Sequence, residues 1–248
     1  MLWKLYKYVE IISGTVLEIE KIQNNRAHSK KTKRSKRTSH TPEAMAKNKE
    51  RQAVKKLARL INCNFIAGDM IVTLTYKQDD RPDTPEKTKK DIANFLRRLK
   101  EACKKIGIEL IYIGVSNFGC KGVPHHHMLL KANLITAVDI EALWGLGIVR
   151  FTKLTNRDNG DYTKIAYYFL RHTNKVYNDP KRRVHAKRYI SSRNLKQPII
   201  ITKIIKSDSW RAAPSAPNGY WLISDSVINS VNSITGWPYQ YYKCIRLT

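Results

Sequence analysis

Three consecutive histidines, His125, His126 and His127, lie directly before the apolar run 128–130. In a β-strand successive side chains point to opposite faces, so His125 and His127 would share one face, about 6.6 to 7 Å apart. Two imidazoles placed in this way can bind one divalent metal ion. The alternative is three solvated histidines at a turn. The apolar run that follows favours a strand, and therefore a metal site.

A second group of reactive side chains lies in the segment 162–172, which has the pattern of a helix and contains Tyr167, Tyr168 and Arg171. Adjacent residues lie about 100° apart around a helix, so only one of the tyrosines can face a given site. Arg171 follows Tyr168 by three residues and shares its face. A guanidinium or a metal ion near a phenol favours the nucleophilic phenolate. Taken alone, the helix favours the simpler interpretation of two core tyrosines.

The charge of the chain indicates its class of partner. Lys and Arg number 46 against 20 acidic residues, a formal net charge of +26, which predicts a polyanion and above all nucleic acid. We expect no membrane partner, because there is no run of 18 apolar residues. Lys4, Lys7 and Glu10 argue against a signal peptide. The four cysteines have no CxxC spacing, which is typical of reduced thiols in a cytoplasmic protein.

Several basic residues are candidates for contacts with DNA phosphates. The run 28–40 has no acidic and no apolar side chain, so it cannot offset its ordering entropy and should be a flexible basic loop. A solvated linker without a partner is the alternative for this run. A second basic segment spans 181–188. The candidates are Lys30, Lys31, Lys33, Arg34, Lys36, Arg37, Arg182, Arg183 and Arg193.

The remaining pattern predicts the elements that must position these side chains. Capping residues begin helices at Thr41 and Thr84. Strands are expected at 3–9, 15–22, 70–76, 110–115, 125–130 and 149–154, and helices also at 137–143 and 162–172. The turn before the histidines is too short for a parallel crossover. The fold class is therefore α+β, a central antiparallel sheet with flanking helices. We divide the chain into 1–40 (hairpin and basic loop), 41–198 (the central domain) and 199–248 (a β-rich aromatic extension).

These features together resemble the HUH endonucleases of rolling-circle replication, the replication initiators of bacterial plasmids, phages and integrative elements. Three motifs support the resemblance: 72–76 (VTLTY), His125–His127, and Tyr168–Arg171, where lysine is usual at the last position. The stretches INCNFIAGDM, LWGLGIVRF, SSRNLKQP and GWPYQYY are also similar. The resemblance implies the HUH (RRM-like) fold for the central domain.

The resemblance also implies roles for individual residues. His125 and His127 would bind Mn²⁺ or Mg²⁺, and Tyr168, assisted by Arg171, would attack single-stranded or hairpin origin DNA. The resulting 5′-phosphotyrosine link frees a 3′-hydroxyl for the host replication machinery. Relatives have a glutamate as third ligand where this chain has Asn117. Asn117 itself, or a substitute acid such as Asp69 or Asp79, would complete the site.

Three alternatives use the same residues differently. The first is a non-catalytic descendant that binds origin DNA or RNA. The second is a relaxase-like nickase of conjugative transfer, with the same chemistry. The third is a plain basic RNA-binding protein in which the histidines are fortuitous.

Overall fold

The computed structural model divides the chain into two compact units, residues 1–49 with 197–248 and residues 50–196. The residues that it describes are 5–23, 41–118, 124–132, 136–156, 159–177, 179, 181–207, 209–231 and 237–247. We call the unit of residues 50–196 the central unit and the other the terminal unit. Among the described helices, none is both long and apolar enough to cross a membrane.

The central unit is built on a five-stranded antiparallel sheet in the order β6-β3-β5-β4-β7. Neighbouring strands β4 and β5 form the hairpin that the short connection predicts. The bounds are β3 Met70–Thr75, β4 Tyr112–Phe118, β5 Pro124–Leu130, β6 Val149–Lys153 and β7 Ile190–Ser191.

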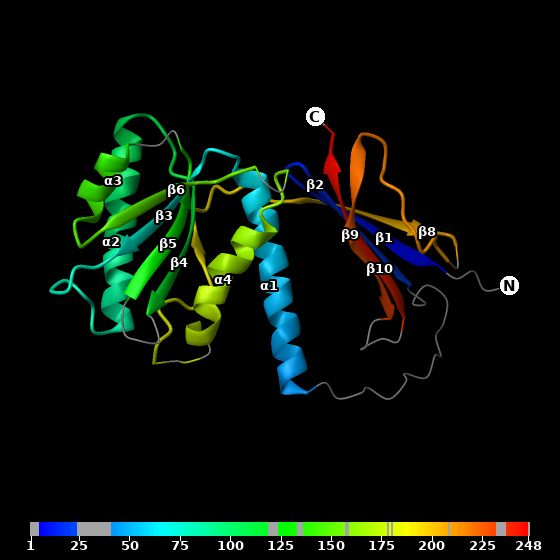
Figure 1. The fold of residues 1–248 in the computed structure, drawn as a ribbon, viewed down its shortest axis with the longest axis horizontal. Coiled ribbons are helices and arrows are strands. Elements are labelled where there is room, and N and C mark those ends of the chain that lie inside the picture. Colours follow the sequence, from blue (N-terminus) through cyan, green and yellow to red (C-terminus); the bar gives the residue numbers. More distant parts are fainter. Residues whose placement is uncertain are drawn as a thin grey trace. The chain divides into compact units, whose positions relative to one another are not determined.

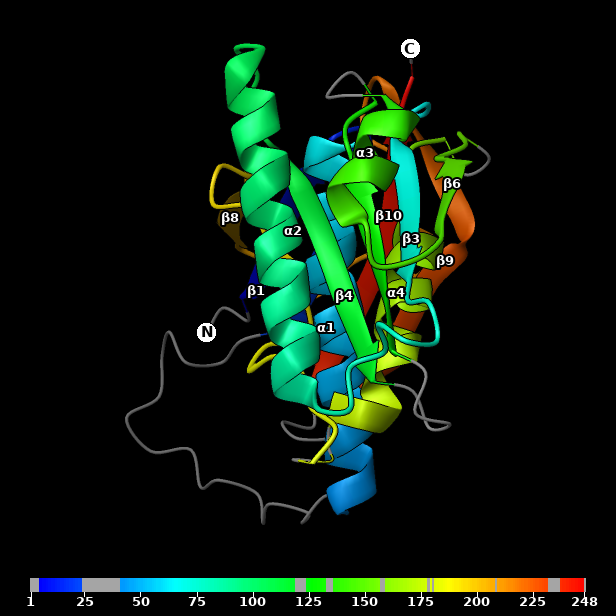
Figure 2. The ribbon, with the colours of Figure 1, turned by 90° about the vertical axis from the view of Figure 1, so that its left-hand side faces the viewer.

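Four helices flank this sheet, as the α+β class predicts. They are α1 Pro42–Asn64, α2 Pro85–Lys105, α3 Ala137–Trp144 and α4 Thr163–Tyr177. Helices α2 and α3 lie on one face of the sheet, and α4 with the C-terminal part of α1 lies on the other (Figure 1). Figure 2 views the sheet from the α2 and α3 side. The fold class inferred from the sequence is therefore confirmed.

The start of α2 shows why local sequence was enough to predict it. Thr84 is the N-cap residue, and its side chain accepts a hydrogen bond of 3.2 Å from the amide of Lys87. Pro85 has no amide hydrogen and fits the first helical position. After the helix, Gly107 adopts a φ of +73°, which reverses the chain at little steric cost.

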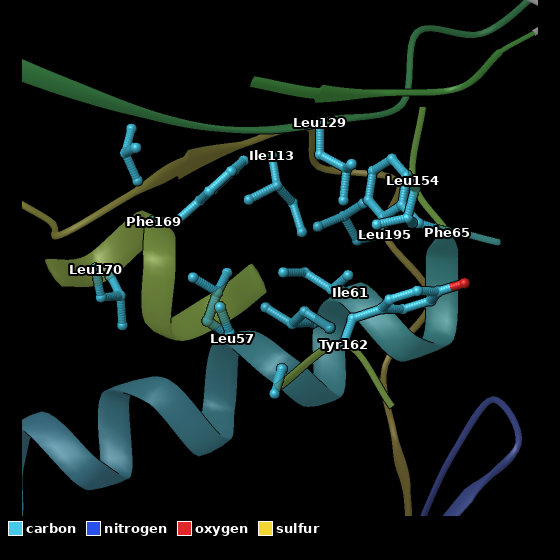
Figure 3. Close-up of a cluster of buried hydrophobic side chains, with 14 residues drawn as sticks. Leu57, Ile61, Phe65, Ile113, Leu129, Leu154, Tyr162, Phe169, Leu170 and Leu195 are labelled. Atoms are coloured by element: carbon cyan, nitrogen blue, oxygen red, sulfur yellow. The ribbon is translucent and has the colours of Figure 1, made fainter. Parts of the chain in front are cut away.

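Two hydrophobic clusters pack on opposite faces of the central sheet, and the alternation along β5 assigns its side chains to them. Leu129 packs in the α1/α4 cluster (Figure 3). Met128 and Leu130 pack in the α2/α3 cluster with Phe95 and Trp144. Both clusters are needed to bury a strand that is apolar on both of its faces.

The terminal unit is a second antiparallel sheet, in the order β8-β1-β2-β10-β9. Its strands are β1 Tyr6–Ser13, β2 Val16–Gln23, β8 Ile199–Ile205, β9 Tyr220–Val231 and β10 Pro238–Arg246. The hairpin of β1 and β2 was predicted from the sequence, and Gly14 in its turn has a φ of +61°. Sequence patterns assigned the two ends of the chain to separate segments, 1–40 and 199–248. In the structure β1 pairs with β8 and β2 with β10, so strands of both ends share one sheet.

Gly147 offers a test of how tightly the end of β3 is packed. A Cβ atom at this position would lie 2.7 Å from Tyr76 Cα and 2.8 Å from Lys77 N, and it would also meet the carbonyl oxygen of Thr75. These are backbone atoms, which cannot rotate away. Gly147→Ala should therefore lower the free energy of unfolding by about 3 kcal/mol, measured by urea denaturation.

Gly114→Ala is the matched control for this substitution. Its Cβ would come no closer than 3.4 Å to another heavy atom, the side-chain Cγ of Met128. Equal losses of stability in the two variants would contradict the packing described for Gly147.

Candidate active site

The register of the central sheet brings the polar side chains of three strands to one face. His125 on β5 lies opposite Thr75 of β3 and Asn117 of β4. His127 lies opposite Thr73 and Val115. Directly opposed residues of antiparallel strands have side chains on the same face. This is the face that packs against α1 and α4.

The two histidines of this face are close neighbours, as the strand pattern predicts. Their ring centroids lie 5.0 Å apart, with the ring planes at 75°. His127 is only 5% exposed, and its Nδ1 lies 3.0 Å from the hydroxyl of Thr73. A hydrogen bond of this kind orients a metal-binding imidazole through the nitrogen that does not bind the ion. A metal ion at His127 would therefore be bound through Nε2.

Asn117 completes a set of donor atoms on this face. Its side chain is 8% exposed, and Oδ1 is buried with no hydrogen-bond partner among the described residues. A buried carbonyl oxygen without a partner is costly, and a hard cation can satisfy it. Two imidazoles and one amide oxygen therefore fit a divalent ion such as Mn²⁺ or Mg²⁺.

The acidic residues considered as substitutes for Asn117 differ in their surroundings. Asp69 precedes β3 at the end opposite to Thr75, and its carboxylate accepts bonds from the Ile66 and Ala132 amides and from Lys131. It is therefore a structural residue of that end of the sheet. Asp79 lies in an exposed turn after β3. In the described parts of the chain, no three His, Cys, Asp or Glu side chains form a metal-binding group.

Tyr168 lies beside this donor set. Helix α4 buries Ala166, Phe169 and Leu170, and it leaves Tyr167 52% and Tyr168 41% exposed. The interpretation as two core tyrosines is therefore wrong. The Tyr168 ring centroid lies 5.2 Å from that of His127, with the ring planes at 61°. The phenol and the histidine pair thus meet on one face of the sheet.

The other predicted site residues have different environments. Arg171 is exposed on α4, three residues after Tyr168 and thus on its face of the helix. Arg182 forms an ion pair of 3.5 Å with Asp179, whereas Arg183 and Arg193 are exposed. The candidates Lys30, Lys31, Lys33, Arg34, Lys36 and Arg37 lie outside the described residues.

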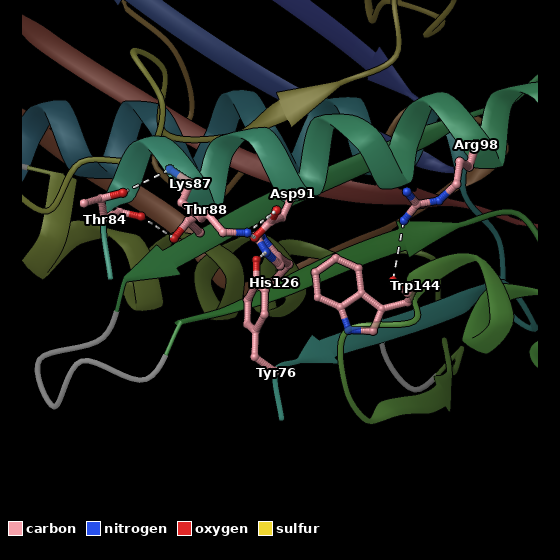
Figure 4. A network of polar contacts seen from close by, with 8 residues as sticks. All are labelled: Tyr76, Thr84, Lys87, Thr88, Asp91, Arg98, His126 and Trp144. Carbon is pink, nitrogen blue, oxygen red and sulfur yellow. Dashed lines mark hydrogen bonds and ion pairs between the residues drawn. The ribbon is translucent and has the colours of Figure 1, made fainter. Parts of the chain in front are cut away.

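The middle histidine has a role that sequence reasoning missed. His126 is fully buried on the opposite face, with Nε2 2.9 Å from the Tyr76 hydroxyl and Nδ1 2.8 Å from the Ser116 hydroxyl. The Ser116 hydroxyl also lies 2.9 Å from Nε2 of His185. Figure 4 shows His126 and Tyr76 under α2, close to Trp144. Strand alternation already indicated that His126 faces away from the other two, but nothing local pointed to Ser116 or His185.

Burial determines the protonation of this chain of polar groups. Burial, with a smaller effect of His185, lowers the pKa of His126 to about 3. Burial, followed by the charge of Lys89, lowers the pKa of His185 to about 4. Burial and then Asp91 raise the pKa of Tyr76. Both imidazoles are therefore neutral at pH 7, and Tyr76 keeps the proton that it can donate to His126.

These pKa shifts predict how stability depends on pH. An unfolded histidine has a pKa near 6.5, so the unfolded chain binds more protons than the folded one as the pH falls below that value. The free energy of unfolding should thus decrease between about pH 6.5 and pH 4, by about 1.4 kcal/mol per pH unit for the fully buried His126. Urea denaturation at pH 7, 6 and 5 measures this slope. His185→Gln should make it shallower, and an unchanged slope would remove His185 from this effect.

The contribution of Asn117 to metal binding can be tested with an isosteric variant. Asn117→Asp adds a negative charge opposite His125 and should tighten Mn²⁺ binding about tenfold, measured by calorimetric titration. Asn62→Asp is the matched control, because Asn62 is equally buried but its Oδ1 accepts a hydrogen bond from the Tyr162 amide. An unchanged Mn²⁺ affinity in Asn117→Asp would exclude Asn117 from the site.

Comparison with known proteins identifies the kind of protein in which these residues lie. Residues 69–175 match the family model of the replication-associated protein ORF2. The match covers less than half of the chain, and it includes β3 to β6, the three histidines and Tyr168. No curated protein and no solved structure matches the chain. The matched region, which contains the candidate site, is thus similar to a replication-associated protein family.

Proposed function

We propose that this protein is a replication initiator that nicks single-stranded origin DNA and becomes linked to it through Tyr168. The observation that supports this most directly is the 5.2 Å between the ring centroids of Tyr168 and His127. Asn117 and His125 lie on the same face of the sheet. The similarity of this region to a replication-associated family supports DNA as the substrate.

The proposed reaction is a transesterification at phosphorus. The Tyr168 oxygen attacks the scissile phosphate, and a phosphorus–oxygen bond to tyrosine forms while the bond to the 3′-oxygen breaks. The phenol proton passes to water, and the departing 3′-oxygen takes a proton from water. The products are a 5′-phosphate linked to Tyr168 and a free 3′-hydroxyl, from which the host polymerase can extend the strand.

The other residues of the site prepare this step. His125, His127 and Asn117 would hold a divalent ion, which when bound supplies polarisation of the phosphate oxygens. Thr73 orients the His127 ring through the contact at Nδ1. Arg171, on the same face of α4 as Tyr168, provides positive charge that favours the phenolate and the phosphate. Exposure of the Tyr168 ring leaves room for a DNA strand to approach.

One observation favours a second candidate function, the binding of origin DNA without cleavage. Asn117 is an amide at the position where the HUH endonucleases have a carboxylate ligand. An amide oxygen supplies no negative charge, so the ion would be held more weakly. In this second function the same sheet face would hold a DNA strand without forming a covalent link.

A single experiment tests the proposed nicking activity. The full-length protein is incubated with single-stranded origin DNA and Mn²⁺, and covalent adducts are separated on a denaturing gel. Tyr168→Phe should abolish the adduct, because the attacking oxygen is removed. Tyr167→Phe is the matched control, since this neighbouring tyrosine is also exposed on α4, and it should retain the adduct.

Two results would argue against the mechanism. Tight DNA binding by the unmodified protein without any adduct would support the non-catalytic function. An adduct that persists in Tyr168→Phe but is lost in Tyr167→Phe would assign the attack to Tyr167 instead.

A further inference from the structure

A pocket outside the histidine and tyrosine site lies at the outer edge of β4. Strand β7 pairs with β4 only at Ile113 and Gly114, and the segment 183–188 follows the edge beyond them. The pocket, which we call the basic pocket, is lined chiefly by Ser116, Thr173, Arg183, His185, Lys187 and Arg188. It belongs entirely to the central unit.

The charge of the basic pocket suits a phosphate group. Three of its lining residues are cationic and none is acidic. The nearby Lys89 on α2 adds to the positive potential, since its charge is felt at His185. The hydroxyl of the buried Thr173 donates to the Leu170 carbonyl, so the cations supply the attraction for an anion. Charge-assisted hydrogen bonds to phosphate are the strong ones at such sites.

The basic pocket is held in place by the buried polar chain of the middle histidine. Ser116 joins His126 in the core to His185 in the pocket wall, at 2.8 and 2.9 Å. Val184, next to His185, is buried as well. The segment that presents Lys187 and Arg188 is therefore anchored to the sheet, and less entropy is lost when a ligand binds.

The basic pocket is also close to the residues of the candidate active site. Ser116 directly precedes Asn117 on β4, a distance of about 3.3 Å along the strand. Thr173 follows Tyr168 by five residues, about 7.5 Å along α4. A DNA strand with one phosphate at Tyr168 would thus have neighbouring phosphates within reach of the pocket.

We propose that the basic pocket binds a backbone phosphate of single-stranded DNA adjacent to the phosphate at Tyr168, and so fixes the strand for cleavage. This inference rests on the proposed action on single-stranded DNA. It assigns a phosphate contact to Lys187 and Arg188, and it separates Arg183 from Arg182. Arg183 lines the pocket, whereas Arg182 is paired with Asp179.

Binding of a labelled 12-nucleotide oligothymidylate tests the proposal. The full-length protein with Tyr168→Phe, in the presence of EDTA, is titrated by fluorescence anisotropy at several salt concentrations, so that neither nucleophile nor metal contributes. Adding Lys187→Ala should weaken binding roughly three- to tenfold and reduce the salt slope by about 0.7, the value for one phosphate on a single strand. Lys181→Ala is the matched control, an exposed lysine of the same segment that does not line the pocket.

Each outcome has a distinct meaning. A selective loss in Lys187→Ala supports the basic pocket, whereas equal losses in both variants would indicate a diffuse basic surface and overturn it. No loss in either variant would overturn it too. An oligouridylate bound more tightly than oligothymidylate, with the same loss in Lys187→Ala, would assign the pocket to RNA and overturn the proposal for DNA.

The proposal and the nicking activity can fail separately. If the unmodified protein forms no adduct with origin DNA but the selective loss in Lys187→Ala persists, the pocket stands without the cleavage. If Lys187→Ala forms adduct normally and keeps the full salt slope, the pocket is excluded while nicking remains. Thermal unfolding of both lysine variants checks that neither substitution of an exposed side chain has altered the fold.

Discussion

The pleat of β5 is the constraint on which the central unit depends. Because successive side chains alternate between faces, the three histidines cannot act together. His125 and His127 face α1 and α4, where Asn117 and Tyr168 also lie. His126 faces α2 and α3 among the residues of the second hydrophobic cluster. A shift of one residue in the register would exchange these environments and bury the pair of histidines that share a face with Tyr168.

The face of His126 shows how a polar group is accommodated in a core. A fully buried imidazole is tolerated because both ring nitrogens have partners, the Tyr76 hydroxyl and the Ser116 hydroxyl. Burial keeps the ring neutral, so no charge has to be paired. The same hydroxyl of Ser116 meets His185, which links the middle of the sheet to the segment that forms the basic pocket. Such a fully bonded chain stiffens the strand that positions Asn117.

The opposite face has the reverse character, with polar groups that are close together and partly open. Tyr168 is exposed, His125 is partly exposed, and the buried oxygen of Asn117 has no hydrogen-bond partner in the described structure. Groups left in this condition within a well-packed unit are typical of sites that bind a ligand. The replacement of a carboxylate by an amide leaves this donor set without negative charge. Metal affinity, rather than the geometry of the phenol, is therefore the weakest part of the proposed mechanism.

Much of the central unit could be predicted from the sequence because its signals are local. Thr84 and Pro85 began α2, the spacing of apolar residues indicated its buried face, and the short connection made β4 and β5 antiparallel. The period of two along β5 was enough to pair His125 with His127. The resemblance to the HUH endonucleases added Tyr168 and Asn117 to this pair.

Tertiary structure alone decided the features that depend on residues far apart in the chain. The pairing of β1 with β8 joins segments almost 200 residues apart, and no local pattern encodes such a partner. Helix periodicity could not distinguish two core tyrosines from two exposed ones, because Ala166, Phe169 and Leu170 form the buried stripe of α4. The contact of His185 with Ser116 depends on the path of the segment after α4. Local signals depend on neighbours within a few residues, whereas these contacts exist only once the sheet and its helices have packed.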